Sequence, residues 1–384
     1  MTLSIDIARS LHDQKKFKES IEICKDILSE DSSSLEALKL IGKSLFYIGK
    51  IEEACSYQNQ ALSVSSNDYE LLKDLGNSYQ ASGKIEYAKE YYEKAINIKS
   101  DYAPALTNLG IVELRSSNIK KASILLEKAT EIDPKLAIGW LNLGSCYLKA
   151  SRKEEGEKAI RKSIDLNPSL FNAHFMLANF LIEKQELEEA ELYLRKTIEL
   201  KPKFFPAYLN LATTLKNLGQ LKEAEIAIRN ALELKSNHVI SLSNLGTILR
   251  ELGELREAEL VTRKAININP NLAETYVNLG GILKDLGQFT EAEDLTRKSI
   301  DLNPRIQEAY LNLGCLLVEK AKRLEDNSKY KEAKDYMYKS INLNSQCAES
   351  NFTLGSILIE LGEYVEAELY TKEAIKINPV FAEA

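Results

Sequence analysis

Residues 239–272 read VISLSNLGTILRELGELREAELVTRKAININPNL, and this stretch contains two amphipathic helical patterns. In the first pattern, leucines recur from Leu242 to Leu249 at intervals of three and four residues, which is one stripe of a helix. A second stripe follows Gly253, whose tolerance of positive φ suits a helix C-terminus and a tight turn. Pro270 lacks the N–H group that would continue the second helix. The stretch therefore predicts a helix, a short turn and a second helix.

The same pattern recurs every 34 residues along the chain. Asn-Leu-Gly stands at 108–110, 142–144, 244–246, 278–280 and 312–314. A glycine in the first helix also pairs with an alanine in the second, as Gly246 does with Ala258, and two small residues allow a close helix crossing. We divide the chain into eleven repeats over 1–381 and the opening of a truncated twelfth at 382–384. The repeats start at residues 1, 35, 69, 103, 137, 171, 205, 239, 273, 307 and 348.

A 34-residue helix-turn-helix period with these small residues and a closing proline resembles the tetratricopeptide repeat. The closing prolines are Pro134, Pro168, Pro202, Pro270, Pro304 and Pro379. The resemblance implies an all-α solenoid, a single superhelix in which each repeat contacts mainly its neighbours. The tenth repeat has seven extra residues near 319–328, about two helical turns, so we expect a longer helical arm there.

Composition and charge favour a protein partner. The chain has a net charge of -7 and a pI of about 5.4, which disfavours binding to nucleic acid or to an anionic membrane. No apolar run long enough to span a membrane occurs, and the N-terminus lacks a signal-peptide pattern. Five cysteines without CxxC spacing fit a reducing compartment. We therefore expect a cytoplasmic protein that does not insert into membranes.

The residues that usually carry catalysis are sparse. His12, His174 and His238 are the only histidines, and none has a neighbour at the spacing of metal ligands. No phosphate-binding glycine loop and no GxSxG motif occurs. We predict no catalytic residue, no metal and no cofactor for this segment.

A row of asparagines marks the candidate binding surface. Positions two, six, nine and thirteen of the first helix lie opposite its buried stripe, and in similar arrays this face lines the concave groove. Asparagine is a mediocre helix former, but its amide both donates and accepts, which suits a peptide backbone. The row consists of Asn108, Asn142, Asn210, Asn244, Asn278 and Asn312, with Asn172 and Asn179 in the sixth repeat.

This row is similar to that of the O-linked N-acetylglucosamine transferase and SPINDLY-type family, whose N-terminal superhelix holds substrate polypeptide. The alternative interpretation is that asparagine is simply common at this position of the repeat. Apolar residues lie on or beside the row in the fourth to seventh repeats, and they could bind a partner or pack on the next helix. They are Ile111, Leu114, Ile138, Leu141, Leu148, Phe175, Ile182 and Leu209.

Charged residues also follow this face toward the C-terminus. The face becomes acidic there, whereas Lys216, Arg250 and Lys284 form a basic row along one edge. Such charges are often only solvated, but as a binding surface they would favour a ligand of mixed charge. A carboxylate clamp for acidic C-terminal tails is matched by Lys73 and Asn77 together with Asn108, but Ile138 stands where a basic residue is needed. We do not expect tail capture of that kind.

Three functions remain open from the sequence. The first is a non-enzymatic scaffold that binds an extended peptide or a partner helix. The second is the substrate-recognition arm of a larger enzyme, such as a glycosyltransferase whose catalytic domain would follow residue 384. The third is a purely architectural array. Because the pattern stops inside a repeat, we also predict end-to-end self-association through the uncapped last helix.

Overall fold

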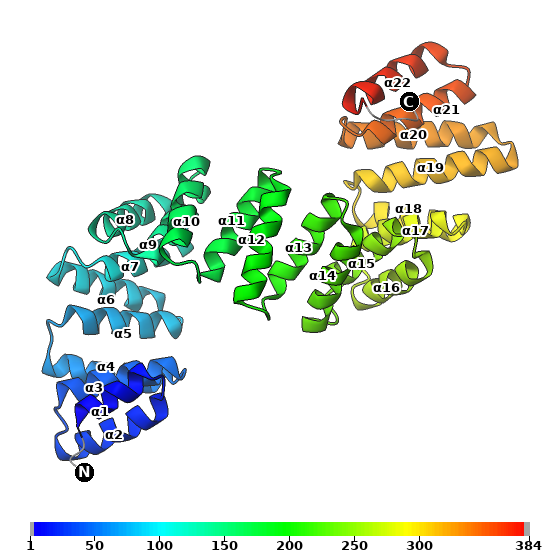
Figure 1. The fold of residues 1–384 in the computed structure, drawn as a ribbon. Coiled ribbons are helices and arrows are strands. Elements are labelled where there is room, and N and C mark those ends of the chain that lie inside the picture. Colours follow the sequence, from blue (N-terminus) through cyan, green and yellow to red (C-terminus); the bar gives the residue numbers. More distant parts are fainter. Residues whose placement is uncertain (1–3, 380–384) are drawn as a thin grey trace. The chain divides into compact units, whose positions relative to one another are not determined.

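The computed structural model describes residues 4–379, and over these residues the chain forms 22 α-helices and no strand (Figure 1). The predicted all-α repeat fold is confirmed. The helices alternate along the chain as the first helix (helix A) and the second helix (helix B) of helix-turn-helix pairs. The chain divides into two compact units, residues 1–180 and 181–384. The prediction of one superhelix concerns how these units join, and it stays a prediction.

The N-terminal unit contains the first five helix pairs. Its helices A are α1 (Ile5–Asp13), α3 (Leu35–Tyr47), α5 (Tyr69–Ala81), α7 (Ala103–Arg115) and α9 (Ala137–Lys149). Its helices B are α2 (Phe17–Glu30), α4 (Ile51–Val64), α6 (Ile85–Ile98), α8 (Ile119–Ile132) and α10 (Lys153–Leu166). The division between the two units falls within α11 (Phe171–Glu183), the helix A of the sixth repeat.

The C-terminal unit begins with the last residues of α11 and its helix B. Its other helices A are α13 (Phe205–Asn217), α15 (Val239–Glu251), α17 (Ala273–Asp285), α19 (Gln307–Leu324) and α21 (Ala348–Glu360). Its helices B are α12 (Leu187–Leu200), α14 (Leu221–Leu234), α16 (Leu255–Ile268), α18 (Phe289–Leu302), α20 (Asn327–Leu343) and α22 (Tyr364–Ile377). From α3 onward, every helix A begins at the residue where the sequence pattern starts a repeat.

The turn between the two helices of a repeat uses a left-handed residue. In the eighth repeat Gly253 has a φ of 80° and its N–H donates to the carbonyl of Arg250 at 3.0 Å, while Glu254 N–H donates to Leu249 at 2.8 Å. These bonds satisfy carbonyl groups at the end of α15. Where glycine is absent, as at Ser117 with a φ of 63°, another residue accepts the same conformation.

The close crossing of the two helices is present, and a threonine contributes to it beside the predicted alanine. A Cβ atom added to Gly246 would overlap the side chain of Thr262, and it would lie 3.5 Å from the carbonyl oxygen of Ala258. Thr262 Oγ1 donates to that same carbonyl at 2.7 Å. The side chain that faces the glycine is therefore that of Thr262, one helical turn beyond Ala258.

Buried side chains of consecutive helices form each joint of the core. Between the ninth and tenth repeats, Leu279 and Leu283 of α17 cluster with Ala292 of α18 and Leu316 of α19. Helix α17 also packs against α15 and α19, the helices A on either side. A repeat therefore does not bury its apolar face alone, and its stability depends on its neighbours.

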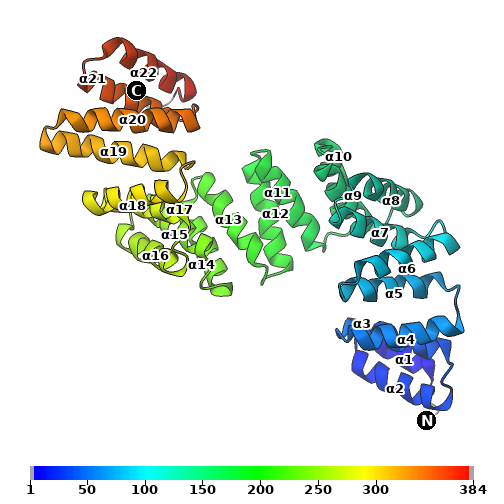
Figure 2. The ribbon, with the colours of Figure 1, turned by 180° about the vertical axis from the view of Figure 1, so that it is seen from behind.

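The tenth repeat has the predicted longer arm. Helix α19 has 18 residues and α20 has 17, compared with 13 in α15 and 14 in α16 (Figure 2). Helix α19 is five residues longer than α15, and α20 is three residues longer than α16. The turn between them is one residue shorter, which leaves the seven extra residues of the repeat. In this turn Glu325 has a φ of 51°, and the Asp326 carboxylate accepts the Ser328 N–H at 2.9 Å to cap α20.

The last helix pair ends close to the limit of the described residues. Val365 and Leu369 of α22 are highly exposed, at 88% and 63%. The predicted opening of a twelfth repeat, residues 382–384, lies outside the described residues. End-to-end self-association therefore stays a prediction. No helix within residues 4–379 is both long enough and apolar enough to cross a membrane.

Candidate functional site: the helix-A face

The candidate site is the surface formed by positions two, six, nine and thirteen of each helix A, which we call the helix-A face. Successive helices A touch within each unit, for example α3 with α5 and α17 with α19, so these positions form rows from repeat to repeat. In the last three repeats the members are Glu274, Asn278, Gly281, Asp285, Glu308, Asn312, Cys315, Glu319, Glu349, Thr353, Ser356 and Glu360.

In the fourth and fifth repeats the asparagine amides are half-buried and held by hydrogen bonds. Asn108 Nδ2 donates to the side-chain oxygen of Asn77, on the preceding helix A, at 2.7 Å. Asn142 Nδ2 donates to the carbonyl of Ile138 in its own helix at 2.7 Å. On α11, Asn172 is exposed and Asn179 is half-buried, as is the neighbouring Phe175.

In the C-terminal unit two amides of the row connect neighbouring helices A. Asn278 Nδ2 donates to Ser243 Oγ at 2.8 Å, and Asn312 Nδ2 donates to the Val277 carbonyl at 3.5 Å. Asn210 and Asn244 are likewise half-buried. Among the described residues, no hydrogen bond to Oδ1 is found for the following members of the row: Asn108, Asn142, Asn278 and Asn312. Each of these amides keeps an acceptor and one N–H for another molecule.

The predicted basic row forms ion pairs between repeats. Lys216 Nζ lies 3.8 Å from Glu251, and Arg250 Nε lies 2.5 Å from Asp285. The Arg250 guanidinium also covers Gly281, where an added Cβ atom would lie 2.6 Å from Nη1. Lys284, the next member, has no ion pair among residues 4–379. The first two members of the row therefore reinforce the contact between helices, which the sequence alone did not indicate.

Most acidic side chains of the face are unpaired in the last three repeats. Across the described part of the chain, no basic group lies within ion-pair distance of five of them: Glu274, Glu308, Glu319, Glu349 and Glu360. A hollow of about 410 Å³ lies among these helices, with Cys315, Val318 and Phe352 beside Glu319 and Glu349. Burial raises the pKa of the Cys315 thiol, so it is protonated at neutral pH. The hollow combines apolar surface with three carboxylates, those of Asp285, Glu319 and Glu349, and one ammonium group, that of Lys284.

The apolar residues predicted near the row have mixed locations. Leu114 and Leu141 are buried core residues, with 5% and 4% exposure, whereas Ile138 is 40% exposed. The remaining members are half-buried: Ile111, Leu148, Ile182 and Leu209. For Leu114 and Leu141 the packing interpretation is correct, because the neighbouring helices cover them.

The residues that resemble a carboxylate clamp are already engaged within the chain. Lys73 forms an ion pair with Asp74, and the Asn77 side-chain oxygen accepts hydrogen bonds from Tyr92 and Asn108. Among residues 4–379, no group of three or more histidine, cysteine, aspartate or glutamate side chains is arranged to hold a metal ion.

The structure also shows a feature that the sequence analysis missed, an arginine–glutamate ladder along the helices B of the C-terminal unit. Each arginine pairs with a glutamate one turn earlier in its own helix and with a glutamate of the next helix B. Arg263, for example, lies 2.9 Å from both Glu259 and Glu291. The amino-acid sequence does carry a signal for this ladder, because the motif EAExxxR recurs every 34 residues. Its arginines are Arg195, Arg229, Arg263 and Arg297.

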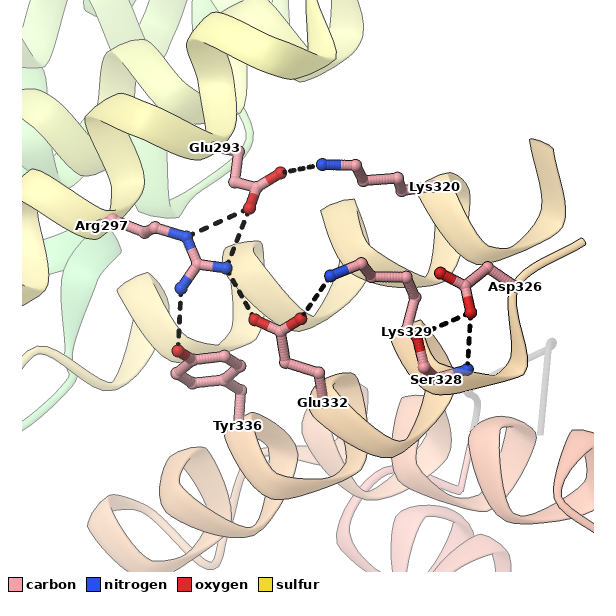
Figure 3. A network of polar contacts seen from close by, with 8 residues as sticks. All are labelled: Glu293, Arg297, Lys320, Asp326, Ser328, Lys329, Glu332 and Tyr336. Atoms are coloured by element: carbon pink, nitrogen blue, oxygen red, sulfur yellow. Dashed lines mark hydrogen bonds and ion pairs between the residues drawn. The ribbon is translucent and has the colours of Figure 1, made fainter. Parts of the chain in front are cut away.

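At the tenth repeat the ladder widens into a network (Figure 3). Arg297 pairs with Glu293 and with Glu332 of α20, and it donates to the Tyr336 hydroxyl at 2.9 Å. Lys320, on the lengthened α19, lies 3.1 Å from Glu293. Partial burial acts to raise the pKa of Glu293, but hydrogen bonds from Arg297 and Lys320 hold this pKa below its ordinary value.

Helix pairs with glycine crossings and a shared helix-A face define a tetratricopeptide-repeat protein. Residues 5–239 match the family model described as Cilia and flagella-associated protein 70 C-terminal domain. The model for the tetratricopeptide repeat matches residues 240–272, 273–306 and 348–381. Because the first match covers more than half of the chain, the chain belongs to that family. The tetratricopeptide prediction is confirmed, whereas the likeness to the glycosyltransferase superhelix stays a prediction.

Solved structures similar to this chain include three proteins, and the first of them shows the same fold. The Cut9–Hcn1 hetero-tetramer of the APC/C has a TM-score of 0.53 and 13% identity, over 98% of this chain and 93% of that chain. Yeast Tom70 has a TM-score of 0.49 and 13% identity, over 98% and 92%. YrrB, a TPR protein with an unusual peptide-binding site, has a TM-score of 0.45 and 22% identity, over 49% and 96%. A search of curated proteins found no match.

Proposed function

We propose that this protein is a non-enzymatic scaffold that binds an extended segment of a partner protein on its helix-A face. The observation that supports this function best is the state of the asparagine amides. Four amides of the row have one N–H bonded within the chain, which fixes the orientation of the group, while the carbonyl oxygen has no partner among the described residues: Asn108, Asn142, Asn278 and Asn312. A fixed amide with a free acceptor loses little freedom when a ligand binds.

The chemistry of the row suits a polypeptide backbone. A peptide group offers one donor and one acceptor, as a side-chain amide does, so the two can pair whatever the ligand's sequence. In the C-terminal unit Asn244, Asn278 and Asn312 lie on successive helices A that touch, so a chain in extended conformation could meet these amides in turn. The row therefore supports recognition of main chain rather than of one particular side chain.

The charge of the face supports a preference for basic segments in the last three repeats. Two of the unpaired carboxylates, Glu319 and Glu349, line a hollow that also includes Val318, Phe352 and one lysine, Lys284. A ligand with lysine or arginine beside an apolar residue would complement this surface. The alternative role, a substrate-recognition arm of a larger enzyme, would use the same surface and stays a prediction.

The test is a triple variant, Asn244→Ala, Asn278→Ala and Asn312→Ala. A peptide is first selected from a displayed random library on the wild-type protein, and its Kd is then measured for both proteins. We expect at least about tenfold weaker binding, equivalent to roughly one lost hydrogen bond. The unfolding midpoint should change little, because alanine is the better helix former and offsets the lost contacts.

A matched control replaces three asparagines of the helices B by alanine: Asn230, Asn267 and Asn342. This control should bind the peptide as the wild type does. Unchanged affinity of the helix-A triple would refute the amide row as the binding site. Failure of the library to yield any peptide would count against the function itself.

A further inference from the structure

The extra residues of the tenth repeat form one wall of a hollow of about 530 Å³, which we call the arm hollow. Helix α17 has 13 residues, whereas α19 has 18 and therefore continues for five residues, from Lys320 to Leu324, beyond the ordinary length of a helix A. Arg323 and Leu324 in this extension line the arm hollow together with Phe289, the first residue of α18. A repeat of ordinary length would lack Arg323 and Leu324, so the insertion itself builds this surface.

Part of the arm hollow is apolar and accessible. Leu316 of α19 is 2% exposed and forms its floor, and the Phe289 ring is half-buried. Leu324, in the last turn of α19, is 62% exposed. An apolar side chain of a partner that covered Leu324 and Phe289 would remove this surface from water, which favours binding.

The Arg323 guanidinium is positioned by an aromatic ring but has no ionic partner. Its central carbon lies over the Phe289 ring, 4.1 Å from the ring centre. Among residues 4–379, no carboxylate lies within ion-pair distance of Arg323, and its N–H groups make no hydrogen bond. A guanidinium carries five N–H donors in a planar fork that matches a carboxylate, so Arg323 can bind one from another molecule.

The acidic groups at the arm hollow are already neutralised within the chain. Glu291 and Glu293 line it, and both are ion-paired (Figure 3): Glu291 with Arg263, and Glu293 with Arg297 and Lys320. Glu319 borders the neighbouring hollow, which shares Phe289 with this one but contains more carboxylates than ammonium groups. Among the charged groups that line the arm hollow, the one without a partner in the described chain is therefore the cation Arg323.

We propose that the arm hollow binds a segment of a partner protein in which a glutamate or aspartate adjoins a leucine or another bulky apolar residue. The carboxylate would accept N–H bonds from Arg323, and the apolar side chain would cover Leu324 and Phe289. This site goes beyond the proposed function, because no member of the helix-A face lines the arm hollow. It also has the opposite charge preference to the hollow beside Glu319 and Glu349.

The test uses three capped pentapeptides at low salt. Two are acetyl-Ala-Leu-X-Leu-Ala N-methylamide with Glu or Gln as X, and the third is acetyl-Ala-Ala-Glu-Ala-Ala N-methylamide. Their dissociation constants for the full chain are measured by saturation-transfer NMR. The Leu-Glu-Leu peptide should bind about fivefold more tightly than the Gln peptide, the scale of one partly exposed ion pair, and more tightly than the peptide without leucine.

This preference for Glu over Gln should shrink at high salt, because the ion pair would be partly exposed to solvent. Equal binding of the Glu and Gln peptides would overturn the inference, and so would the absence of binding by the Leu-Glu-Leu peptide. Equal binding of the peptide without leucine would show that the apolar part of the arm hollow is not used and would overturn it as well.

Matched variants assign the binding to the arm hollow. Arg323→Met should abolish the preference for Glu over Gln, whereas Lys322→Met removes the same charge from an exposed neighbour outside the hollow and should keep it. Leu324→Ala should weaken the Glu and Gln peptides alike, since it removes apolar surface and no charge. Equal losses in the two charge variants would mean that the preference reflects only the net charge of the arm. That result, or unchanged binding in Leu324→Ala, would overturn the inference.

The proposed function is tested separately. The triple variant at Asn244, Asn278 and Asn312 should bind the Leu-Glu-Leu peptide as the wild type does, because these amides lie outside the arm hollow. Weaker binding in the triple variant would place the peptide on the helix-A face, which would overturn this inference and support the amide row. Loss of library-peptide binding in the triple variant, with no effect of Arg323→Met on the Leu-Glu-Leu peptide, would leave the proposed function intact and refute the arm hollow alone.

Discussion

The two faces of the C-terminal unit treat charge in opposite ways. On the helices B, arginines pair with glutamates from one repeat to the next, and Arg229 and Arg263 each contact two carboxylates. On the helix-A face of the last repeats, carboxylates such as Glu319 and Glu349 have no described partner, and the amides are only partly used. The difference separates a surface that holds neighbouring repeats together from one that keeps its bonding capacity for another molecule.

The largest expected effect is at the crossing that joins the two faces. Gly246→Leu should destabilise the protein by roughly 1–3 kcal/mol or more, because the added side chain would overlap Thr262. The measurement is the free energy of unfolding in urea. Lys264→Leu, on the exposed side of α16, is the control and should have little effect. An unchanged midpoint for Gly246→Leu would contradict the close crossing.

The ladder should contribute stability and not binding. Arg297→Met keeps the apolar stem but removes the pairs with Glu293 and Glu332, and we expect a loss of about 1 kcal/mol. The loss should shrink at high salt, since the groups are partly exposed. Arg305→Met, where no ion pair is found in the described chain, serves as control. Weakened peptide binding in Arg297→Met would contradict the proposal that the ladder stabilises the protein and that only the helix-A face binds the ligand.

The same network predicts an acid-sensitive contribution. Because the pKa of Glu293 is lowered in the folded protein, its contribution is complete above the unfolded-state pKa near 4.5 and is lost as pH falls through the folded-state pKa. Chemical denaturation between about pH 6 and pH 3 should show a smaller loss for Arg297→Met than for the wild type. Parallel loss in both proteins would mean that the network does not couple to folding.

The smallest effect on stability is expected on the helix-A face. Glu319→Gln removes an unpaired charge, so the unfolding free energy should stay within about 0.5 kcal/mol of the wild type. Binding of a capped alternating Lys-Ala peptide should weaken severalfold at low salt and less at high salt. Asp294→Asn, an unpaired and exposed position on α18, should leave this binding unchanged. Equal effects of the two variants would remove the distinction between the faces.

Much of the fold could be predicted from the chain because each repeat uses local rules. The start of α15 at Val239 and its turn at Gly253 follow from apolar spacing and from the conformational freedom of glycine. The half-buried position of Asn278 also follows from helical phase. Its bond to Ser243 could not be predicted, because the two residues are 35 positions apart and meet only when two helices pack.

The sequence by itself determined the 34-residue period, the helix pairs, the longer tenth repeat and the positions that face away from the core. These properties depend on the order of neighbouring residues, which the chain carries directly. The tertiary structure alone decided that Thr262 faces Gly246, that Arg263 bridges two helices B, and that Arg323 lies over the Phe289 ring. Those outcomes depend on how far one helix is displaced against the next, and side chains bond only when that displacement brings their atoms within about 3 Å.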